Sequence, residues 1–574
     1  MKHLVLVLFA VLLHTVTIKP CASVSVPLFH VFAHCVDWNK QYDNPFNYSE
    51  VGLLADIVSP EKTVTIDGFY FQDYNRSLVN GKEHLQAVGL PLWCFRFSPI
   101  VEGQHSVTVS IIDKTGKHKI TNMTFQATRE GSDMQGYVRV GKNNIHFQFD
   151  GGKTYFPIGE NVCWVSYDRG TYGYDNYFNS LAQHGGNYAR LWLTDVQWDG
   201  LAVEISVGKY NLGDLWRLDY VVALAERLNM RLLMCTESFN LLRSKSGPHL
   251  WETSYYNKAN GGILDHPQDF FTSELAKMDY KNRLRYLIAR YSYSTSVFAW
   301  EYFNEVDITD DYNSNAQVLW INEMTKWVHR YDVNRHLIST SFSNSVGDVN
   351  VQSLDSLDFT MTHNYGQSDI AMTTALYAKK KLLQYHKPSY VAEFGISNED
   401  HDKEGWSLHN GLWATTVQLA AGTCMTWWWD SWVAPNHLYG IFDGISRFVN
   451  DIGNLADYAW VPVVNATVSV PTLRLFAMYG HQDKETTGLV ALWLQDSCST
   501  WSQHFAGNTC KTQKNVSLSL SLPRCVEGTD HVVDWYNTTS GQQISSMQPK
   551  CQSNVLSLTA VEFVNDVAAL VHVA

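Results

Sequence analysis

The sequence lacks the marks of several protein classes. No Lys/Arg run is longer than Lys379–Lys381 and the net charge is −13, so nucleic acid is not an expected partner. No stretch beyond the N-terminus reaches about 18 uninterrupted apolar residues, so we expect no membrane span. The CxxC and HExxH patterns and a glycine-rich phosphate loop are also missing. A metal site is therefore not indicated, no cofactor is expected, and an open phosphate-binding sheet is disfavoured.

The N-terminus has the pattern of a secretory signal. Lys2 and His3 precede the apolar run Leu4–Leu13, and the small residues of Cys21-Ala22-Ser23 offer a cleavage site. A membrane anchor is the alternative, but the run is too short to span a bilayer comfortably. We therefore expect residues 1–23 to be a signal peptide and the protein to be secreted, with a lysosomal destination equally compatible.

The cysteines fit an oxidising compartment. Four of the ten cluster near the C-terminus and predict two disulfides, Cys498–Cys510 and Cys525–Cys551 being one of three possible pairings. Cys35 and Cys94 could form a third bridge. The remaining candidates lie in or beside apolar runs and are expected to be buried thiols: Cys163, Cys235 and Cys424.

Glycosylation sequons separate the middle of the chain from its flanks. None of the six falls between residues 123 and 464, and glycans require exposed surface. The sequons are at Asn47, Asn75, Asn122, Asn465, Asn515 and Asn537.

Both flanks alternate apolar and polar residues. Residues 24–134 do so in runs such as Lys62–Phe69, separated by turn residues at Asn80-Gly81 and Lys114-Thr115-Gly116. Residues 465–574 return to this pattern, with strands expected at Val516–Leu522 and Val555–Phe563. Each flank is predicted to be a β-sandwich.

The central residues 135–464 have a different pattern of apolar and polar residues. They begin with an expected hairpin over 135–155, with Asp150-Gly151-Gly152 as its turn. Eight short apolar runs then alternate with helical patterns such as Leu215–Leu228 and Trp320–Val328, and eight is the strand number of an α/β (β/α)8 TIM barrel. The expected strands are Phe156–Gly159, Tyr188–Leu193, Arg231–Cys235, Val297–Phe303, Leu337–Ser341, Phe359–Thr362, Tyr390–Phe394 and Gly422–Trp428.

Two glutamates each follow one of these apolar runs. Glu393 comes 88 residues after Glu305, a spacing that fits three strand-plus-helix units of about 30 residues each. Both would then lie on the rim where barrel enzymes keep their chemistry. Cleavage of a glycosidic bond needs such a pair, because one carboxyl gives a proton and the other attacks or activates water.

Linked motifs make the barrel region recognisable. Phe156–Asn161, Asn187–Trp192, Trp300–Asp307, His363-Asn364-Tyr365, Glu393-Phe394-Gly395 and Thr426–Asp430 stand where successive barrel strands are expected. In these stretches the chain resembles the retaining glycoside hydrolases of clan A, most closely the family 5 type of cellulases and mannanases. Bacterial members of that kind often carry an immunoglobulin-like domain ahead of the barrel, which is the identity expected for residues 24–134.

The resemblance implies a role for each matching residue. Glu305, preceded by Asn304, would be the acid/base, and Asn304 would bind the sugar 2-hydroxyl. Glu393 would be the nucleophile, supported by Arg190 and Tyr365. His363 would line the same rim, and Trp427 or Trp429 would form the floor under the sugar.

Other residues are weaker candidates. Glu160, Glu237 and Asp430 also end strand-like runs and could bind sugar hydroxyls, although solvated or hydrogen-bonded rim carboxylates need no function. Asp307, His409 and Asn410 are weaker still.

The sequence thus predicts a secreted retaining β-glycosidase. A β-mannan, a β-glucan or a related β-glycoside remains open as substrate, since loop shape decides it. A transglycosylase would use the same residues. An inactive carbohydrate-binding barrel is disfavoured, because it has no need of both carboxylates. The oligomeric state is not readable.

Overall fold

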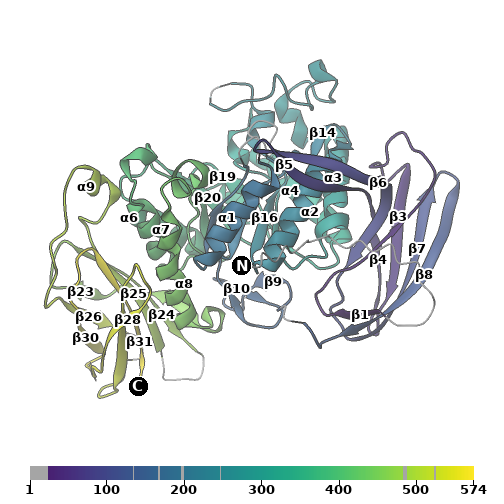
Figure 1. Cartoon of the computed structure of the whole chain (residues 1–574). Helices are drawn as coiled ribbons and strands as arrows, with labels where there is room; N and C mark the ends of the chain where they lie inside the picture. The colour runs from purple at the N-terminus through teal and green to yellow at the C-terminus, as the bar shows by residue number, and fades with distance from the viewer. Residues whose placement is uncertain are drawn as a thin grey trace, which may run out of the picture.

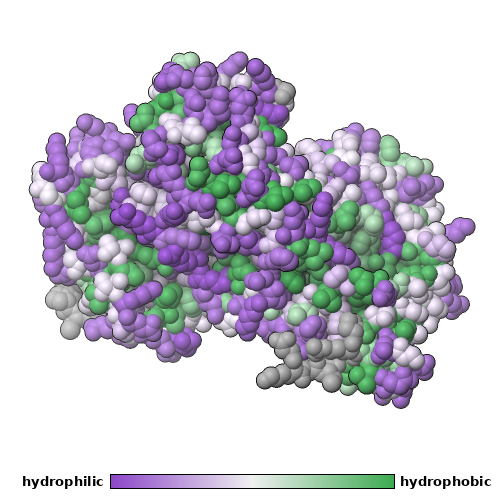
Figure 2. Space-filling model, turned by 180° about the vertical axis from the view of Figure 1, so that it is seen from behind, coloured by the Kyte–Doolittle hydropathy of each residue, from purple (hydrophilic) through white to green (hydrophobic). Residues whose placement is uncertain are grey.

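The computed structural model describes residues 24–132, 135–165, 169–194, 200–245, 247–482, 488–522 and 525–574. The predicted signal peptide, residues 1–23, lies outside the described residues. Figure 1 shows three regions side by side: N-terminal sheets, a central region of strands and covering helices, whose strands are here called the ring, and C-terminal sheets. Among the described residues, no helix combines the length and apolar character needed to cross a membrane. On the face shown in Figure 2, hydrophobic residues are scattered in small groups among hydrophilic ones.

Two sheets form the N-terminal region and enclose a core between them. That core includes Leu53, Ile57, Phe95, Val109 and Phe125, none of which is exposed. One sheet has the order β1-β8-β7-β3-β4 and the other β2-β6-β5. Their bounds are β1 Val24–Pro27, β2 Phe32–Val36, β3 Val51–Val58, β4 Thr63–Asp67, β5 Phe69–Val79, β6 Lys82–Phe97, β7 Gly103–Asp113 and β8 Gly116–Thr128. The turns expected at Asn80-Gly81 and Lys114–Gly116 join β5 to β6 and β7 to β8.

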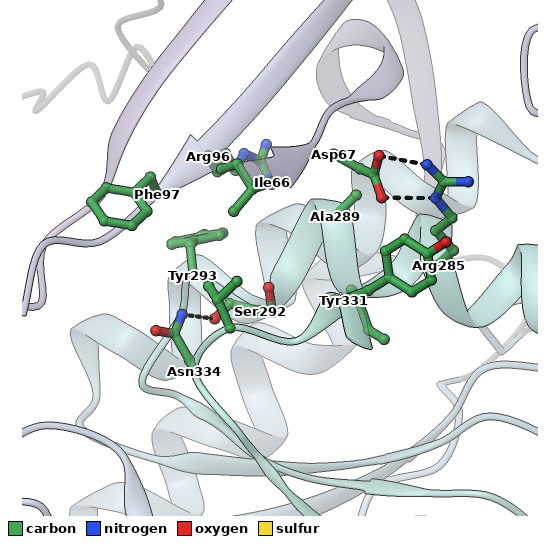
Figure 3. A pocket seen from close by; sticks show the side chains of 12 residues that line it. Ile66, Asp67, Arg96, Phe97, Arg285, Ala289, Ser292, Tyr293, Tyr331 and Asn334 are labelled. Atoms are coloured by element: carbon green, nitrogen blue, oxygen red, sulfur yellow. Dashed lines mark hydrogen bonds and ion pairs between the residues drawn. The ribbon is translucent and has the colours of Figure 1, made fainter. Parts of the chain in front are cut away.

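The N-terminal region is fastened to the helices of the ring by ion pairs. Arg76 of β5 binds Asp175 at 2.9 Å, which holds the long β5–β6 hairpin across the ring. Asp67 accepts two hydrogen bonds of 2.7 Å from Arg285, as Figure 3 shows. In the same seam Asn334 donates to the carbonyl of Ser292 at 2.7 Å. The small pocket drawn there lies between the N-terminal region and the helices of the ring.

A three-stranded meander fills one end of the ring. Its strands are β9 Val138–Val140, β10 Phe147–Phe149 and β11 Thr154–Tyr155, so the hairpin expected over 135–155 has one more strand than predicted. The turn at Asp150-Gly151-Gly152 joins β10 to β11 as expected. The Phe147 ring lies 5.0 Å from that of Phe298 and 5.5 Å from that of Phe359. Phe147 thereby closes the end of the ring at which its strands begin.

Parallel strands form two arcs of the ring. The first has the order β12-β13-β16-β17-β18 and the second β19-β20-β21. Their bounds are β12 Gly159–Asn161, β13 Tyr188–Trp192, β16 Arg231–Cys235, β17 Val297–Glu301, β18 Leu337–Ser339, β19 Ser341–Phe342, β20 Thr360–Tyr365 and β21 Ser389–Gly395. Seven of the eight expected strands are therefore present, the fifth being divided at Thr340.

The expectation of a regular eighth strand over Gly422–Trp428 is wrong. This segment is hydrogen-bonded to both neighbours without forming a regular strand. Met425 and Trp427 donate to the carbonyls of Val391 and Phe394 at 3.1 and 3.0 Å, Phe394 donates to that of Met425 at 2.9 Å, and Asn161 donates to that of Thr426 at 3.2 Å. The pairing amounts to an isolated bridge between Phe394 and Thr426, and a π-helical turn, η6 Trp429–Val433, follows.

Helices cover the outside of the ring. They are α1 Thr171–Gln183, α2 Leu212–Arg227, α3 Glu274–Tyr291, α4 Ser314–Tyr331, α5 Val349–Gln352, α6 Ile370–Tyr385, α7 Trp406–Thr416 and α8 Ile441–Ile452. Of the two helical patterns recognised in the sequence, Trp320–Val328 lies within α4, and Leu215–Leu228 lies within α2 except for Leu228, which caps it. Both helices begin at asparagine caps, since Asn211 accepts from Gly213 and Asp214, and Asn313 accepts from Ala316. A short hairpin, β14 Glu204–Ser206 with β15 Lys209–Tyr210, precedes α2.

Two sheets also form the C-terminal region. Their orders are β22-β24-β25-β31-β27-β28 and β23-β26-β30-β29. The strands are β22 Ala459–Pro462, β23 Ala466–Val468, β24 Leu473–His481, β25 Gly488–Asp496, β26 Ser517–Ser521, β27 His531–Tyr536, β28 Gln543–Met547, β29 Cys551–Gln552, β30 Val555–Thr559 and β31 Asp566–Val573, with the short helix α9 at Trp501–Phe505.

All three expected disulfides are present: Cys35–Cys94, Cys498–Cys510 and Cys525–Cys551. The three remaining described cysteines, Cys163, Cys235 and Cys424, are buried thiols as predicted.

Candidate active site

Two carboxyl groups meet at the edge where the ring strands end. Glu305 follows β17, Glu393 belongs to β21, and His363 of β20 lies between them. His363 Nδ1 is 2.7 Å from Glu305 Oε1 and 3.2 Å from Glu393 Oε2. One oxygen of each carboxyl group and the imidazole nitrogen all lie within 4.8 Å of one another. The 88-residue sequence spacing therefore brings the two glutamates together.

Glu305 has an unusual backbone conformation. Its φ of 49° and ψ of 52° are left-handed, a region that non-glycine residues rarely adopt and that recurs at functional sites. The backbone N–H of Glu305 donates to Ser341 Oγ at 3.2 Å, which stabilises this turn. The strained residue is therefore held in place by the neighbouring strand β19.

The environment of Glu305 favours its neutral form. Burial raises the pKa of this carboxyl to about 8, and the negative charge of Asp307 acts in the same direction. The side chain is still 13% exposed, so the group can exchange a proton with a ligand in the open rim. A carboxylic acid with this pKa can act as a proton donor near neutral pH.

Glu393 is held by two hydrogen-bond donors. Arg190 Nη1 lies 2.5 Å from Glu393 Oε1, and the Tyr365 hydroxyl donates to Glu393 Oε2 at 2.5 Å. Burial raises the pKa of Glu393, whereas His363, Arg190 and the Tyr365 hydrogen bond lower it. One oxygen is fixed by a cation and the other by a phenol, so the carboxylate orientation is determined.

Arg190 has a second acidic partner that sequence reasoning missed. Its Nε and Nη2 donate to the two oxygens of Glu301 at 2.6 and 2.8 Å, and Nη2 also donates to Asn304 Oδ1 at 2.8 Å. Arg190 and Glu301 are fully buried. A glutamate inside the apolar run Val297–Phe303 was the available signal, because a buried charge requires a partner.

His363 is neutral in this arrangement. Burial lowers the pKa of its imidazole to about 4, so the ring carries no charge above that pH. Its Nε2 is buried and has no hydrogen-bond partner among the described residues. The contacts to the carboxyl groups are therefore made by Nδ1 alone.

No family model matches the chain. The chain is 26% identical over 311 residues to a mannan endo-1,4-beta-mannosidase 5 of Solanum lycopersicum, covering 46% of this chain and 72% of that protein. It is 25% identical over 342 residues to a putative mannan endo-1,4-beta-mannosidase 4 of Arabidopsis thaliana, covering 50% and 80%.

Solved structures share the fold. A putative glycoside hydrolase from Bacteroides vulgatus superimposes with a TM-score of 0.62 at 13% identity and covers 96% of this chain and 100% of that one. A family 5 glycoside hydrolase from the same organism gives a TM-score of 0.50 at 13% identity, covering 76% and 94%. The chain is a glycoside hydrolase, and it is similar to family 5 enzymes of clan A. Its central ring has the TIM-barrel fold with mixed α/β content.

Aromatic rings form a wall near Arg190, whose guanidinium carbon lies 6.0 Å from the Trp192 ring. The Trp427 ring lies 5.2 Å from those of Trp164 and Trp192, and it is only half-buried. Trp429 is fully buried, and its indole N–H donates to the carbonyl of Trp164 at 3.3 Å. We therefore correct the expectation for Trp429, which packs behind the wall, and retain Trp427 as the residue that can face a sugar.

The weaker carboxylate candidates differ in their surroundings. The Glu237 side chain accepts from Arg283 at 2.7 Å and from Tyr256 at 2.8 Å, so its charge is paired within the fold. Asp430 accepts from the Trp164 indole at 3.0 Å and so supports the aromatic wall. Glu160 is fully buried beside Tyr439, and burial raises its pKa to about 8.

The remaining candidates hold loops or regions together. Asp307 accepts from the backbone and hydroxyl of Ser343 at 2.7 and 2.8 Å. His409 and Asn410 lie on α7 and face the C-terminal region, where they bind Asp566 and the carbonyl of Ser499, both at 2.6 Å. These two are therefore interface residues.

The carboxyl pair with His363 could in principle ligate a metal ion. However, Arg190 and Tyr365 already occupy the two oxygens of Glu393. A divalent cation bound to Glu393 would lie close to the Arg190 guanidinium on the same carboxylate. The two positive charges would repel each other. The donor set therefore suits acid–base and nucleophilic chemistry better than a resident metal.

Proposed function

We propose that the protein is a retaining β-glycoside hydrolase acting on β-1,4-mannan or a closely related polysaccharide. The spacing of the two carboxyl groups carries this proposal. Retaining enzymes keep them about 5–5.5 Å apart, whereas inverting enzymes need roughly 6.5–9.5 Å to admit a water molecule. Oxygens of Glu305 and Glu393 that lie within 4.8 Å of each other favour retention.

The two glutamates would have different roles in two steps. Glu393 attacks the anomeric carbon while Glu305 protonates the departing glycosidic oxygen, so one sugar becomes an ester on Glu393. Glu305, now ionised, removes a proton from water, which attacks the same carbon and releases Glu393. The raised pKa of Glu305 suits a residue that starts protonated, and Arg190 with Tyr365 supports the ionised form of Glu393.

Asn304 and Trp427 would bind the sugar. Asn304 donates to Ser238 Oγ at 3.3 Å and accepts from Arg190, so its amide is fixed beside Glu305 and available for the 2-hydroxyl. Trp427 would provide an apolar face under the ring. Mannan is the first substrate to test because the curated relatives are named for it.

We further propose three folded regions behind a signal peptide of residues 1–23. These are an immunoglobulin-like β-sandwich over 24–134, the catalytic barrel over 135–464 and a second β-sandwich over 465–574. Secretion is supported by the three disulfides, since such bonds persist in oxidising compartments. Five of the six sequon asparagines are exposed and Asn47 is half-buried.

The deciding experiment assays the secreted protein on β-mannan, β-glucan and aryl β-glycosides. Glu393→Ala and Glu305→Ala should each lower activity by at least about 1000-fold, whereas the helix-surface variant Glu323→Ala should match the parent. NMR of the first product should show the β-anomer before mutarotation. Parental activity in Glu393→Ala would overturn the mechanism, and an initial α-anomer would overturn retention.

Chemical rescue separates the roles of the two glutamates. With an activated aryl mannoside, azide should restore turnover of Glu305→Ala and yield a β-glycosyl azide, because the sugar is still carried on Glu393. Azide with Glu393→Ala should yield the α-azide. The opposite pattern would exchange the roles. Added acceptor sugars would reveal a transglycosylase by the appearance of lengthened products.

A further inference from the structure

A disulfide-closed loop of the C-terminal region lies on the catalytic edge of the barrel. This loop, residues 498–510, is closed by Cys498–Cys510 and contains α9; we call it the α9 loop. Figure 1 shows α9 extending beyond the C-terminal sheets toward α6 and α7. The Trp501 indole N–H donates to the carbonyl of Gln367 at 3.0 Å, and the Ser502 hydroxyl donates to that of Ser368 at 3.2 Å.

The same loop also contacts the segment that follows β21. The ring of Phe505 stacks on His401 with centroids 3.8 Å apart and 20° between planes. The ring of His504 stacks on Trp406 at 3.8 Å and 7°. The α9 loop therefore bridges the exits of two neighbouring strands, β20 and β21.

These two strands carry most of the residues around the proposed nucleophile. β20 contains His363 and Tyr365, and β21 contains Glu393. The Gln367 side chain donates to the carbonyl of Tyr365 at 3.0 Å, and the Gly366 N–H donates to the carbonyl of Gly395 at 2.9 Å. A short run of contacts therefore leads from Trp501 through Gln367 to Tyr365, whose hydroxyl binds Glu393.

A second anchor lies beside the first. Arg474 of β24 forms an ion pair with Asp369, and Asp369 caps α6 by accepting from Met372 at 3.3 Å. Three successive residues, Gln367, Ser368 and Asp369, are thus tied to the C-terminal region. These contacts can hold residues 367–369 in one conformation only if the α9 loop itself has little conformational freedom. The Cys498–Cys510 disulfide provides that constraint.

We propose that the α9 loop is a positioning element for the nucleophile, acting through Gln367 and Tyr365 on Glu393. This proposal rests on the function proposed above. The loop touches neither carboxyl group and reaches the reaction only by fixing the Tyr365 hydroxyl. The C-terminal region would then be a part of the catalytic apparatus rather than only a brace.

The measurement that distinguishes a positioning role is the acidic limb of the pH profile, which is the pH range in which activity is lost as Glu393 becomes protonated. Glu393 is faced by Arg190 from β13, by His363 and Tyr365 from β20, and by Glu305 from the end of β17. The Tyr365 hydrogen bond favours the ionised carboxylate, so a displaced hydroxyl raises the pH at which Glu393 loses its proton. A purely structural role would lower thermal stability and leave this pH unchanged.

The test compares two disulfides of the same region in the full-length protein. Cys498→Ser/Cys510→Ser opens the α9 loop, and Cys525→Ser/Cys551→Ser is the matched control, since that bridge lies in the sheet β23-β26-β30-β29. The α9-loop variant should lose about ten-fold in kcat with KM within two-fold, and its acidic limb should rise by about half a pH unit. The control should keep the parental kcat and pH profile despite a lower melting temperature.

Trp501→Phe is a second test, which leaves both disulfides intact and can be measured even if a disulfide variant fails to fold. It removes the indole N–H that reaches Gln367 while keeping an aromatic ring beside His401. It should lower kcat about three-fold with the same direction of pH shift. Parental kcat and an unmoved acidic limb in Trp501→Phe would overturn the proposal. Undiminished activity in Glu393→Ala would instead overturn the proposed function, so the two failures are distinct.

Discussion

Arg190 and Glu301 form a fully buried two-point ion pair beside the carboxyl pair. With Nε and Nη2 committed to Glu301, only Nη1 is directed at Glu393. Glu301 thus fixes the direction of the guanidinium and offsets its charge. Glu393, the proposed nucleophile, is therefore supported by Arg190, whose positive charge is partly offset by Glu301.

Replacing Glu301 tests this relationship. Glu301→Gln keeps the shape but removes the negative charge, so the buried Arg190 keeps only Glu393 as an ion-pair partner. We expect the free energy of unfolding in urea to fall by about 3 kcal/mol. The more positive Arg190 should also lower the pKa of Glu393 and move the acidic limb of kcat/KM to lower pH. Glu323→Gln, which breaks a surface pair with Lys277 and Lys281, should cost less than about 1 kcal/mol.

The pH profile of the parent enzyme should be bell-shaped. Glu305 must be protonated to donate, and its pKa of about 8 places the loss of activity near pH 8 on the basic side. Glu393 must be ionised to attack, and its raised pKa places the acidic limb above the usual value of 4.5. Measuring kcat/KM on an aryl β-mannoside from pH 3 to 10 checks both limbs. A basic limb below about pH 6 would contradict the buried, neutral Glu305.

Asp307 should control the position of the basic limb. Its negative charge raises the pKa of Glu305. Asp307→Asn removes that charge and can still accept from Ser343, so the basic limb should move down by up to about 1 pH unit. Asp310→Asn, which changes a carboxylate bonded to Ser244, is the control and should leave the limb in place. A limb that moves equally in both variants would point to a general charge effect.

The aromatic wall predicts different effects for two neighbouring tryptophans. Trp427→Ala removes the half-buried face available to a sugar and should raise KM about ten-fold, since an aromatic contact contributes about 1 kcal/mol or more. Trp429→Phe changes a buried ring and should lower the free energy of unfolding by about 1–2 kcal/mol with KM unchanged. Steady-state kinetics and urea titration of both variants check this, and equal KM values would disprove the assignment of Trp427.

Glu160 predicts a loss of stability as pH rises. In the folded protein its pKa is raised by burial from 4.5 to about 8. Between these values the native state binds more protons than the unfolded state, so the free energy of unfolding falls with increasing pH. Glu160→Gln should remove this contribution and stabilise the protein by about 4 kcal/mol at pH 8, with little effect at pH 4.5. Glu562→Gln, an exposed change, should leave the pH slope unaltered.

Much of the barrel could be predicted because its strands are continuous apolar runs with clear ends. Arg231–Cys235 was predicted with the bounds of β16, and the rim glutamates follow two such runs. Gly422–Trp428 has the same composition, but its pairing depends on where the chain turns into η6. That turn is set by the packing of the tryptophans on other strands, which no local pattern reveals.

The supporting residues of the site were harder to predict. Glu301 was visible as a charge within an apolar run, but its partner is 111 residues away. Lys381 ends a three-lysine run that suggests a solvated face, yet it is buried and donates to Thr362 Oγ1 at 2.5 Å and the carbonyl of Tyr390 at 2.9 Å. The docking of the α9 loop joins residues more than 130 positions apart. Such contacts depend on the assembled fold.

The packing of Phe147 against Phe298 and Phe359 has a consequence for traffic through the enzyme. Because the meander fills the end of the barrel at which the strands begin, a ligand would reach Glu305 and Glu393 from the opposite edge. Substrate, water and product of the proposed reaction would then exchange through that same edge. Slow release of a product would therefore delay binding of the next substrate.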